Sequence, residues 1–304
     1  MTTAQKVQIL DGGMGRQLKA MGAPFRQPEW SALALIEAPE AVSLAHRQFI
    51  DAGASIITTN NYAVVPFHLG EERFDDQVEN LTVLAGQLAR QEADSAESAI
   101  RVAGSLPPLF GSYRPEFFEA EKAEPAYRRI VASLAPYADI WLAETISCLA
   151  EFKAIRRSLR EQEANFWVSF TLSDELADGR ARLRSEESIS EMLEEVCGSD
   201  GKTVQGILFN CSQPEMITVA LKELHELLPS IDKLFETGGY GNAFTPRGKK
   251  AEANSDIADM RDELTPEHYA DFTNIWHQLG ASVLGGCCGI GPEHIARVKH
   301  SLAS

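Results

Sequence analysis

Short apolar runs alternate with longer segments of helical periodicity along the whole chain. The short runs predict eight strands, at residues 7–10, 55–58, 101–104, 139–143, 166–171, 204–209, 233–236 and 282–285. The longer segments predict eight helices, at residues 41–52, 74–95, 125–137, 148–163, 188–197, 214–228, 266–279 and 292–302. This alternation is typical of repeated βα units, whose strands run parallel in one sheet.

Eight βα units are the number that closes into a TIM-type (β/α)8 barrel. The alternative is an open, doubly wound sheet, which usually carries a phosphate-binding loop after its first strand. The segment Gly12-Gly13-Met14-Gly15 lacks the G-x-G-x-x-G spacing of such a loop. We therefore predict an α/β fold with a single (β/α)8 barrel domain over residues 1–304.

Two predicted connections, residues 106–123 and 237–263, are longer than a barrel needs. Long loops in compact domains are commonly functional. Both follow strands, so they are expected to lie over the C-terminal face of the barrel, where the active sites of this fold are found.

The charge of the chain limits its partners. With 28 Lys and Arg against 44 Asp and Glu, the net charge of -16 disfavours nucleic acid and anionic membrane surfaces. No apolar stretch approaches the roughly 20 residues of a membrane-spanning helix, and no signal-peptide pattern opens the sequence. We expect a cytoplasmic protein, and the sequence leaves its oligomeric state open.

Polar residues stand at the ends of several predicted strands, which would bring them to one rim of a barrel. They are Asp11, Asn60, Ser105, Glu144, Asn210, Cys211, Cys287 and Cys288. The chain has five cysteines, an odd number without the spacing of a disulfide scaffold, so we expect reduced thiols.

Cys211, Cys287 and Cys288 predict a zinc site with its fourth position open, which is the arrangement of catalytic zinc. The glycines around the cysteine pair let the backbone bend sharply enough for both sulfurs to reach one ion. The alternatives are small buried hydrophobic residues or a redox pair. Cys148 and Cys197 fall in predicted helices and are interpreted as packing residues.

Asp11 and Glu144 would lie near these thiols. Two carboxylates beside a thiolate-rich zinc could bind a cationic group such as a substrate ammonium, although strand ends also carry Asp to cap the following helix. Asn60, Asn61 and Tyr62 are weaker candidates for substrate binding, because turns attract asparagine for their own reasons. The seven histidines show no metal-binding spacing and are interpreted as surface or packing residues.

Several segments of the chain form a recognisable series. The most specific is Asn210-Cys211 together with Gly285-Gly286-Cys287-Cys288-Gly289, which is followed by Pro292-Glu293-His294-Ile295. The weaker ones are Asp11-Gly12-Gly13-Met14-Gly15, Ala52-Gly53-Ala54, Ile56-Ile57-Thr58-Thr59-Asn60, Ala103-Gly104-Ser105 and Glu144-Thr145-Ile146. Taken in order, these segments resemble the homocysteine S-methyltransferases over the whole chain.

The resemblance implies a zinc-dependent barrel in which the three cysteines of the rim bind the metal and the sulfur of homocysteine takes the fourth position. It also implies that Asp11 and Glu144 hold the amino group of homocysteine, with Gly12 and Gly13 near its carboxylate. A thiol that enters the coordination sphere of zinc loses its proton, and the thiolate can attack a methyl group on a sulfonium or quaternary ammonium donor.

Three segments depart from the family pattern. Residues 236–244 replace a Pro-Asn-x-Gly-Glu type segment, residues 106–111 replace Gly-Pro-aromatic-Gly, and Arg16 replaces a common threonine. The first two lie in loops expected over the site, so the methyl donor stays open. S-methylmethionine is favoured, S-adenosylmethionine is next, and betaine is an alternative.

Two other functions also stay open. One is transfer to a different thiol on the same zinc barrel, and the other is a non-enzymatic zinc or redox-sensing protein. The latter would need a closed site with four ligands, and no fourth Cys or His stands at a suitable strand end.

Overall fold

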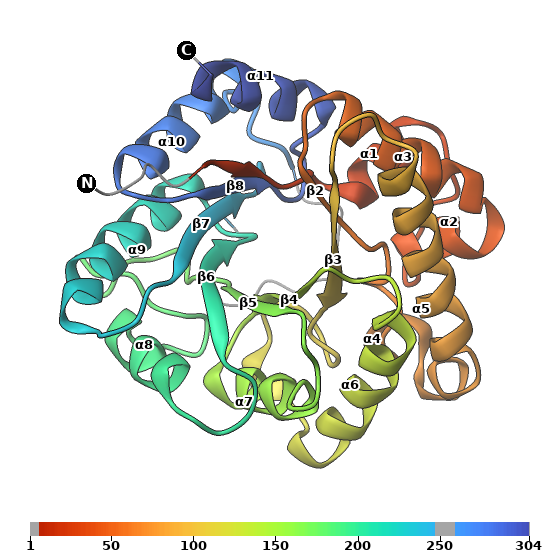
Figure 1. Ribbon diagram of the computed structural model, residues 1–304, viewed down its shortest axis with the longest axis horizontal. Coiled ribbons are helices and arrows are strands. Elements are labelled where there is room, and N and C mark those ends of the chain that lie inside the picture. Colours follow the sequence, from red (N-terminus) through yellow and green to blue (C-terminus); the bar gives the residue numbers. More distant parts are fainter. Residues whose placement is uncertain (1–5, 247–258, 304) are drawn as a thin grey trace.

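The computed structural model, which describes residues 6–246 and 259–303, is a barrel of parallel strands. Its strands are β1 (Gln8–Ile9), β2 (Ile56–Thr58), β3 (Arg101–Leu106), β4 (Ile140–Ile146), β5 (Asn165–Phe170), β6 (Val204–Asn210), β7 (Glu236–Gly241) and β8 (Val283–Gly286). Hydrogen bonds join them in the order β1-β8-β7-β6-β5-β4-β3-β2, and a bridge from Leu10 to Ile56 links β1 to β2. The sheet therefore closes into the ring of Figure 1, and the predicted (β/α)8 fold is confirmed.

Helices surround this barrel on its outside (Figure 1). They are α1 (Met14–Ala20), α2 (Ser31–Glu37), α3 (Pro39–Asp51), α4 (Pro66–Leu69), α5 (Glu71–Asp94), α6 (Ala120–Leu134), α7 (Leu149–Ser158), α8 (Ile189–Cys197), α9 (Pro214–Leu227), α10 (Pro266–Gln278) and α11 (Pro292–Leu302), with 3-10 turns η1 (Pro115–Phe117) and η2 (Leu228–Ser230). The predicted helices correspond to α3 and to α5 through α11. The sequence pattern did not indicate α1, α2 and α4, because helices of four to seven residues are too short to show a helical period. Within the described ranges, none of the helices has the length and apolar character needed to cross a membrane.

Strand side chains fill the interior of the barrel. They belong to Leu10, Ile56, Ala103, Ile140, Leu142, Trp167, Leu208, Tyr240 and Val283. Trp167 is the largest of them and lies over Gly206, where a Cβ would come within 2.5 Å of the indole. A larger apolar cluster packs the outside of the strands against the helices. Burial of both layers favours the closed barrel.

The seventh strand differs from its prediction. Residues 233–236 were expected, but β7 runs from Glu236 to Gly241, so part of the predicted loop 237–263 belongs to the barrel. Glycine weakens an isolated strand, which is why the sequence pattern did not indicate this segment. The close approach of β8 requires glycine at position 238 of β7, because a Cβ on Gly238 would lie 1.9 Å from the carbonyl oxygen of Val283. Residues 247–258 of the predicted loop lie outside the described residues.

The predicted loop 106–123 is also shorter than expected. β3 extends to Leu106 and α6 begins at Ala120, so Pro125, expected at the helix start, lies inside α6. The hydroxyl of Tyr127 on α6 donates a 2.9 Å hydrogen bond to the carbonyl oxygen of Pro107. It also lies 3.1 Å from Oε1 of Glu151 on α7. These contacts fasten the start of the loop to two outer helices.

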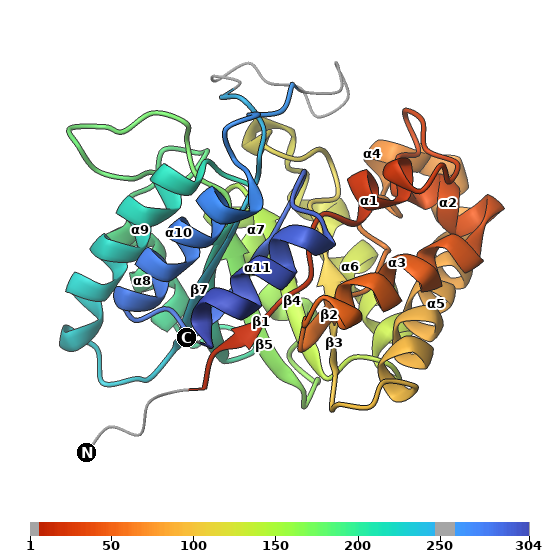
Figure 2. The same ribbon diagram turned by 90° about the horizontal axis from the view of Figure 1, so that it is seen from above.

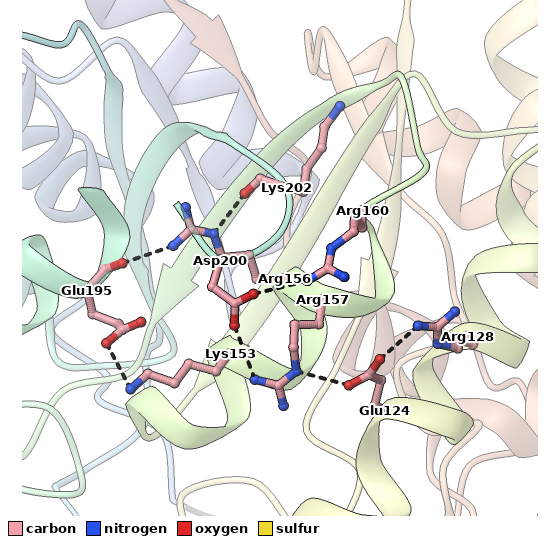
Figure 3. Close-up of polar contacts among 9 residues, drawn as sticks. All are labelled: Glu124, Arg128, Lys153, Arg156, Arg157, Arg160, Glu195, Asp200 and Lys202. Carbon is pink, nitrogen blue, oxygen red and sulfur yellow. Dashed lines mark hydrogen bonds and ion pairs between the residues drawn. The ribbon is translucent and has the colours of Figure 1, made fainter. Parts of the chain in front are cut away.

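A polar network ties α6, α7 and α8 together on the outside of the barrel (Figure 3). The side chain of Arg156 on α7 is 2% exposed and donates to the carbonyl oxygens of Glu195 (3.0 Å) and Gly198. Because the last carbonyls of a helix lack partners within it, Arg156 caps the C-terminal end of α8. It also donates to the carbonyl oxygen of Lys202 at 2.9 Å. More exposed ion pairs surround it, between Lys153 and Glu195, Arg157 and Glu124, and Arg160 and Asp200.

The connections that follow the strands gather on one face. In the side view of Figure 2, the described segments that follow β3, β5 and β7 lie at the top of the molecule. This is the C-terminal face of the barrel, where predicted site residues from distant parts of the chain can meet.

Candidate active site

Three cysteine sulfurs converge at the C-terminal face. The Sγ atoms of Cys211, Cys287 and Cys288 lie within 4.8 Å of one another, and those of Cys211 and Cys288 are 4.0 Å apart. A tetrahedral ion with bonds of about 2.3 Å to sulfur holds its ligands roughly 3.8 Å apart, so a slight contraction would let the three sulfurs share one ion. No fourth His, Cys, Asp or Glu from the described part of the chain joins this group. The donor set therefore fits a thiophilic ion such as zinc, with one position left open.

The turn after β8 positions two of these sulfurs. Gly289 has a φ of +85°, a conformation that favours glycine. The amide of Cys287 donates to the carbonyl oxygen of Gly241 at 2.9 Å. The amide of Ala243 donates to the carbonyl oxygen of Cys288, also at 2.9 Å. The end of β7 thus supports the cysteine turn along its length.

Gly12 and Gly13 pack against the same turn. A Cβ on Gly13 would lie 2.5 Å from the carbonyl oxygen of Cys287, and one on Gly12 would lie 2.2 Å from that of Ile290. The amide of Gly13 donates to the carbonyl oxygen of Ile290 at 2.9 Å. Close approach of two loops therefore requires glycine at both positions. Their place near a substrate carboxylate stays a prediction.

Two buried carboxylates lie in the same region. Asp11 accepts hydrogen bonds from the amide (2.7 Å) and the hydroxyl (3.0 Å) of Thr58, and burial raises the pKa of Asp11 to about 7. Glu144 accepts a 2.5 Å hydrogen bond from the hydroxyl of Ser105. Burial, with smaller contributions from Asp11 and Cys211, raises the pKa of Glu144 to about 8. A ligand cation between the two carboxyl groups would favour their ionised forms.

One cavity of about 160 Å³ connects the thiols and the carboxylates. Most of the predicted site residues line it: Asp11, Gly12, Gly13, Asn60, Tyr62, Glu144, Cys211, Cys287 and Cys288. Asn61, a weaker candidate, is buried and is not among the described residues that line the cavity. Asn60 is buried and donates a 3.3 Å hydrogen bond to the carbonyl oxygen of Ser31. Ser105 and Asn210, expected on the same rim, are not among the described residues that line the cavity. Both are fully buried and contact residues of the cavity wall or their neighbours.

Aromatic rings form much of the remaining wall. They belong to Phe25, Trp30, Tyr62, Tyr113, Tyr240 and Phe244. Trp30 packs edge-on against Phe25, with ring centroids 5.5 Å apart. Neither residue lies in a segment that the sequence singled out. The length of the stretch between the first strand and the first predicted helix is the signal that could have drawn attention to them, because long connections in a barrel often reach the site.

One side chain of the cavity wall is positively charged. Arg16 on α1 lines it, and its guanidinium carbon lies 5.3 Å from the centroid of the Phe244 ring. Of the described lining residues, Arg16 alone carries a fixed positive charge. His68, predicted as a surface or packing residue, lines the cavity as well. Burial lowers the pKa of His68 to about 4, so its ring is neutral near pH 7.

The other two cysteines stand apart from the thiol group. Cys148 is buried and directly precedes α7, and Cys197 is the last residue of α8. Neither belongs to the cluster of possible metal ligands among the described residues. Their interpretation as packing residues agrees with these positions, although Cys148 stands at the N-cap position of α7, without a side-chain capping hydrogen bond, instead of lying within the helix.

Comparison with known proteins gives matches over almost the entire chain. The sequence model of the homocysteine S-methyltransferase family matches residues 8–302. The homocysteine S-methyltransferase of Escherichia coli (strain K12) is 29% identical over 316 residues, which cover 97% of this chain and 95% of that protein. Homocysteine S-methyltransferase 1 of Brassica oleracea var. italica is 26% identical over 322 residues, covering 97% and 93%. Among solved structures, the metallated form of the homocysteine methyltransferase MmuM from Escherichia coli has a TM-score of 0.77 at 27% identity, covering 97% and 96%.

Proposed function

Because this chain belongs to the homocysteine S-methyltransferase family, we propose that it transfers a methyl group from a small onium donor to the sulfur of homocysteine, giving methionine. S-methylmethionine is the donor we favour, and S-adenosylmethionine is next. One observation carries the proposal: three thiols and two buried carboxylates line the same aromatic cavity. Homocysteine carries both a thiol and an ammonium group. A metal held by the three thiols would ionise the first, and the two carboxylates would bind the second.

Cys211, Cys287 and Cys288 would hold zinc. Zinc, when bound, supplies an open coordination position at which a thiol loses its proton at neutral pH. The all-sulfur donor set supports this choice of metal. Hydrogen bonds with Cys211 and Cys288, together with burial, raise the pKa of the Cys287 thiol well above its ordinary value. A bound cation would favour the thiolate form of Cys287, because an opposite charge nearby stabilises the ionised group.

Asp11 and Glu144 would bind the ammonium group of homocysteine. Thr58 and Ser105 hold the two carboxylates in place through the hydrogen bonds described above. Paired with an ammonium, both carboxylates would be ionised, because an opposite charge nearby favours the charged form. Gly12, Gly13 and Asn60 line the cavity and would contact the rest of the amino acid.

The aromatic wall would receive the methyl donor. A sulfonium or quaternary ammonium is attracted to the faces of aromatic rings, and the rings also exclude water from the reacting atoms. Arg16 would pair with a carboxylate of the donor. In the transfer, the bond from the donor sulfur to its methyl group breaks as the bond from the homocysteine sulfur to that methyl forms. The donor keeps the electron pair and leaves as a neutral thioether, and the thiol proton passes to solvent.

The test is a donor screen with homocysteine on zinc-loaded protein. S-methylmethionine, S-adenosylmethionine, betaine and methyltetrahydrofolate are each supplied, and methionine is quantified by mass spectrometry. Transfer from S-methylmethionine supports the proposal. Transfer from betaine alone would show that betaine, and not S-methylmethionine, is the donor. Bound zinc without methionine from any donor would overturn the function. A second thiol such as cysteine, supplied in place of homocysteine, tests the alternative that another acceptor is used.

A cytoplasmic location is part of the same proposal. Thiolate ligands persist in a reducing compartment, whereas oxidising compartments favour disulfides. Cell fractionation of the source organism with an antibody to this protein would test it.

A further inference from the structure

The side chain of Asn210 links the end of β6 to the end of β4 beneath the candidate site. Its Oδ1 accepts hydrogen bonds from the amide of Thr145 and the hydroxyl of Ser169, both at 2.8 Å. Its Nδ2 donates to the hydroxyl oxygen of Thr145 at 2.9 Å. Asn210 is fully buried and is not among the described residues that line the cavity. Its amide therefore acts on neighbouring protein atoms, not on a ligand.

Thr145 has an unusual backbone conformation. Its φ is +59°, a left-handed value that is rare for a β-branched residue. The register between β4 and β5 shifts between Ala143 and Ile146, which is the mark of a β-bulge. A bulge redirects the side chains next to it, and the residue beside Thr145 is Glu144. A strained residue of this kind persists only where its surroundings hold it.

Asn210 holds Thr145 in this conformation through the hydrogen bonds given above. It directly precedes Cys211, one of the three thiols of the proposed metal site. Cys211 also has a left-handed φ, of +49°, and its amide donates to the carbonyl oxygen of Tyr240 at 3.2 Å. Ser105 contacts the carboxylate of Glu144 directly. Ser105 thus orients the carboxylate group, while the backbone that carries it depends on the bulge.

We propose that Asn210 is a positioning residue for recognition of the amino group: by holding Thr145 in its left-handed conformation, it keeps Glu144 aimed into the cavity. This inference rests on the proposed function, in which Glu144 binds the homocysteine ammonium. It assigns Asn210 a role separate from metal binding, although its neighbour Cys211 is one of the three thiols.

The experiment measures the Kd of two thiols for zinc-loaded protein by calorimetry. One is homocysteine, and the other is 4-mercaptobutyrate, which lacks only the amino group. The variants are Asn210→Ala, Thr145→Gly and the double substitution, because glycine adopts a positive φ without support. Zinc content and thermal unfolding of each variant are measured alongside, so that loss of the metal or of the fold is recognised.

We expect Asn210→Ala to weaken homocysteine binding at least about tenfold and 4-mercaptobutyrate binding by less than about twofold, with zinc retained. In the Thr145→Gly background, the effect of Asn210→Ala should shrink to less than about threefold. Equal weakening of both thiols, loss of zinc, or an undiminished effect in the glycine background would overturn the role of Asn210. If the wild-type protein binds homocysteine selectively but transfers no methyl group, the proposed function is contradicted and the role of Asn210 is not.

Discussion

The hydroxyl of Ser105 on β3 donates a 2.5 Å hydrogen bond to Oε1 of Glu144 on β4. This bond stabilises the ionised carboxylate, yet burial still raises the pKa of Glu144 to about 8. Asp11 lies in the same cavity with a pKa of about 7 for the same reason. Two buried carboxyl groups with raised pKa values form a site that a ligand cation would complete, and the first two predictions test the proposed binding of an ammonium group there.

Glu144→Gln should raise the KM for homocysteine about 30-fold, because loss of a buried charged contact costs roughly 2 kcal/mol. Glutamine keeps the size of the side chain and can still bond to Ser105. Steady-state kinetics on zinc-loaded protein would measure the change, with 4-mercaptobutyrate as the matched acceptor without an amino group. If the variant impairs both acceptors equally, Glu144 does not bind the ammonium.

The kcat/KM for homocysteine should rise in two steps as the pH passes about 7 and about 8. At low pH Asp11 and Glu144 are protonated and neutral, and they ionise as the pH passes their pKa values of about 7 and about 8. Ammonium binding is therefore lost as the pH falls. A pH profile of kcat/KM reports groups of the free enzyme, and Glu144→Gln should remove the upper step. An identical profile with 4-mercaptobutyrate would assign the steps to other groups.

Removal of one thiol should remove the metal. Cys288→Ala is expected to reduce bound zinc from about one per chain to near zero and methyl transfer by roughly two orders of magnitude or more, because the acceptor thiol loses its means of ionisation. Cys197→Ala is the matched control, since Cys197 ends α8 away from the thiol cluster. Elemental analysis and the methionine assay would measure both effects. Full zinc in Cys288→Ala would exclude that residue as a ligand.

Arg16→Gln should raise the KM for S-methylmethionine about tenfold, which corresponds to a charge-assisted contact of about 1.4 kcal/mol. The KM for homocysteine should stay within about twofold. The matched donor is (3-aminopropyl)dimethylsulfonium, which is S-methylmethionine without its carboxylate, and its KM should not respond. A higher KM for homocysteine instead would assign Arg16 to the carboxylate of the acceptor.

Arg156→Met should lower the free energy of unfolding by about 2–4 kcal/mol, because it leaves buried carbonyl groups at the end of α8 without donors. Methyl transfer per folded molecule should not change, since Arg156 lies on the outside of the barrel. Arg160→Met is the control: its side chain is 62% exposed in a single ion pair with Asp200, and such pairs contribute about 0–1 kcal/mol. Chemical denaturation would compare the two, and equal losses would contradict a capping role for Arg156.

Several features of this protein could be predicted from its sequence. The alternation of apolar runs and helical segments predicted the barrel, because both periods arise from local backbone geometry. Once the fold is a barrel, the ends of its strands must meet at one face. Cys211 and Glu144, 67 positions apart in the chain, could for this reason be assigned to one site together with Cys287 and Cys288.

Other features depended on contacts that no local pattern contains. The sequence misplaced β7, because its glycines are unfavourable in an isolated strand and are required only by the closeness of Val283. Phe25 and Trp30 reach the cavity from an irregular stretch without a motif.

By itself, the sequence determined the number and order of the βα units and the set of thiols and carboxylates at the strand ends. Only the tertiary structure decided how that site is tuned: the bulge at Thr145, its support by Asn210, and the raised pKa values of Asp11 and Glu144. The reason is physical. Burial, backbone strain and electrostatic coupling arise from contacts between segments that are distant in the sequence, and those contacts form only after the chain has closed into a ring.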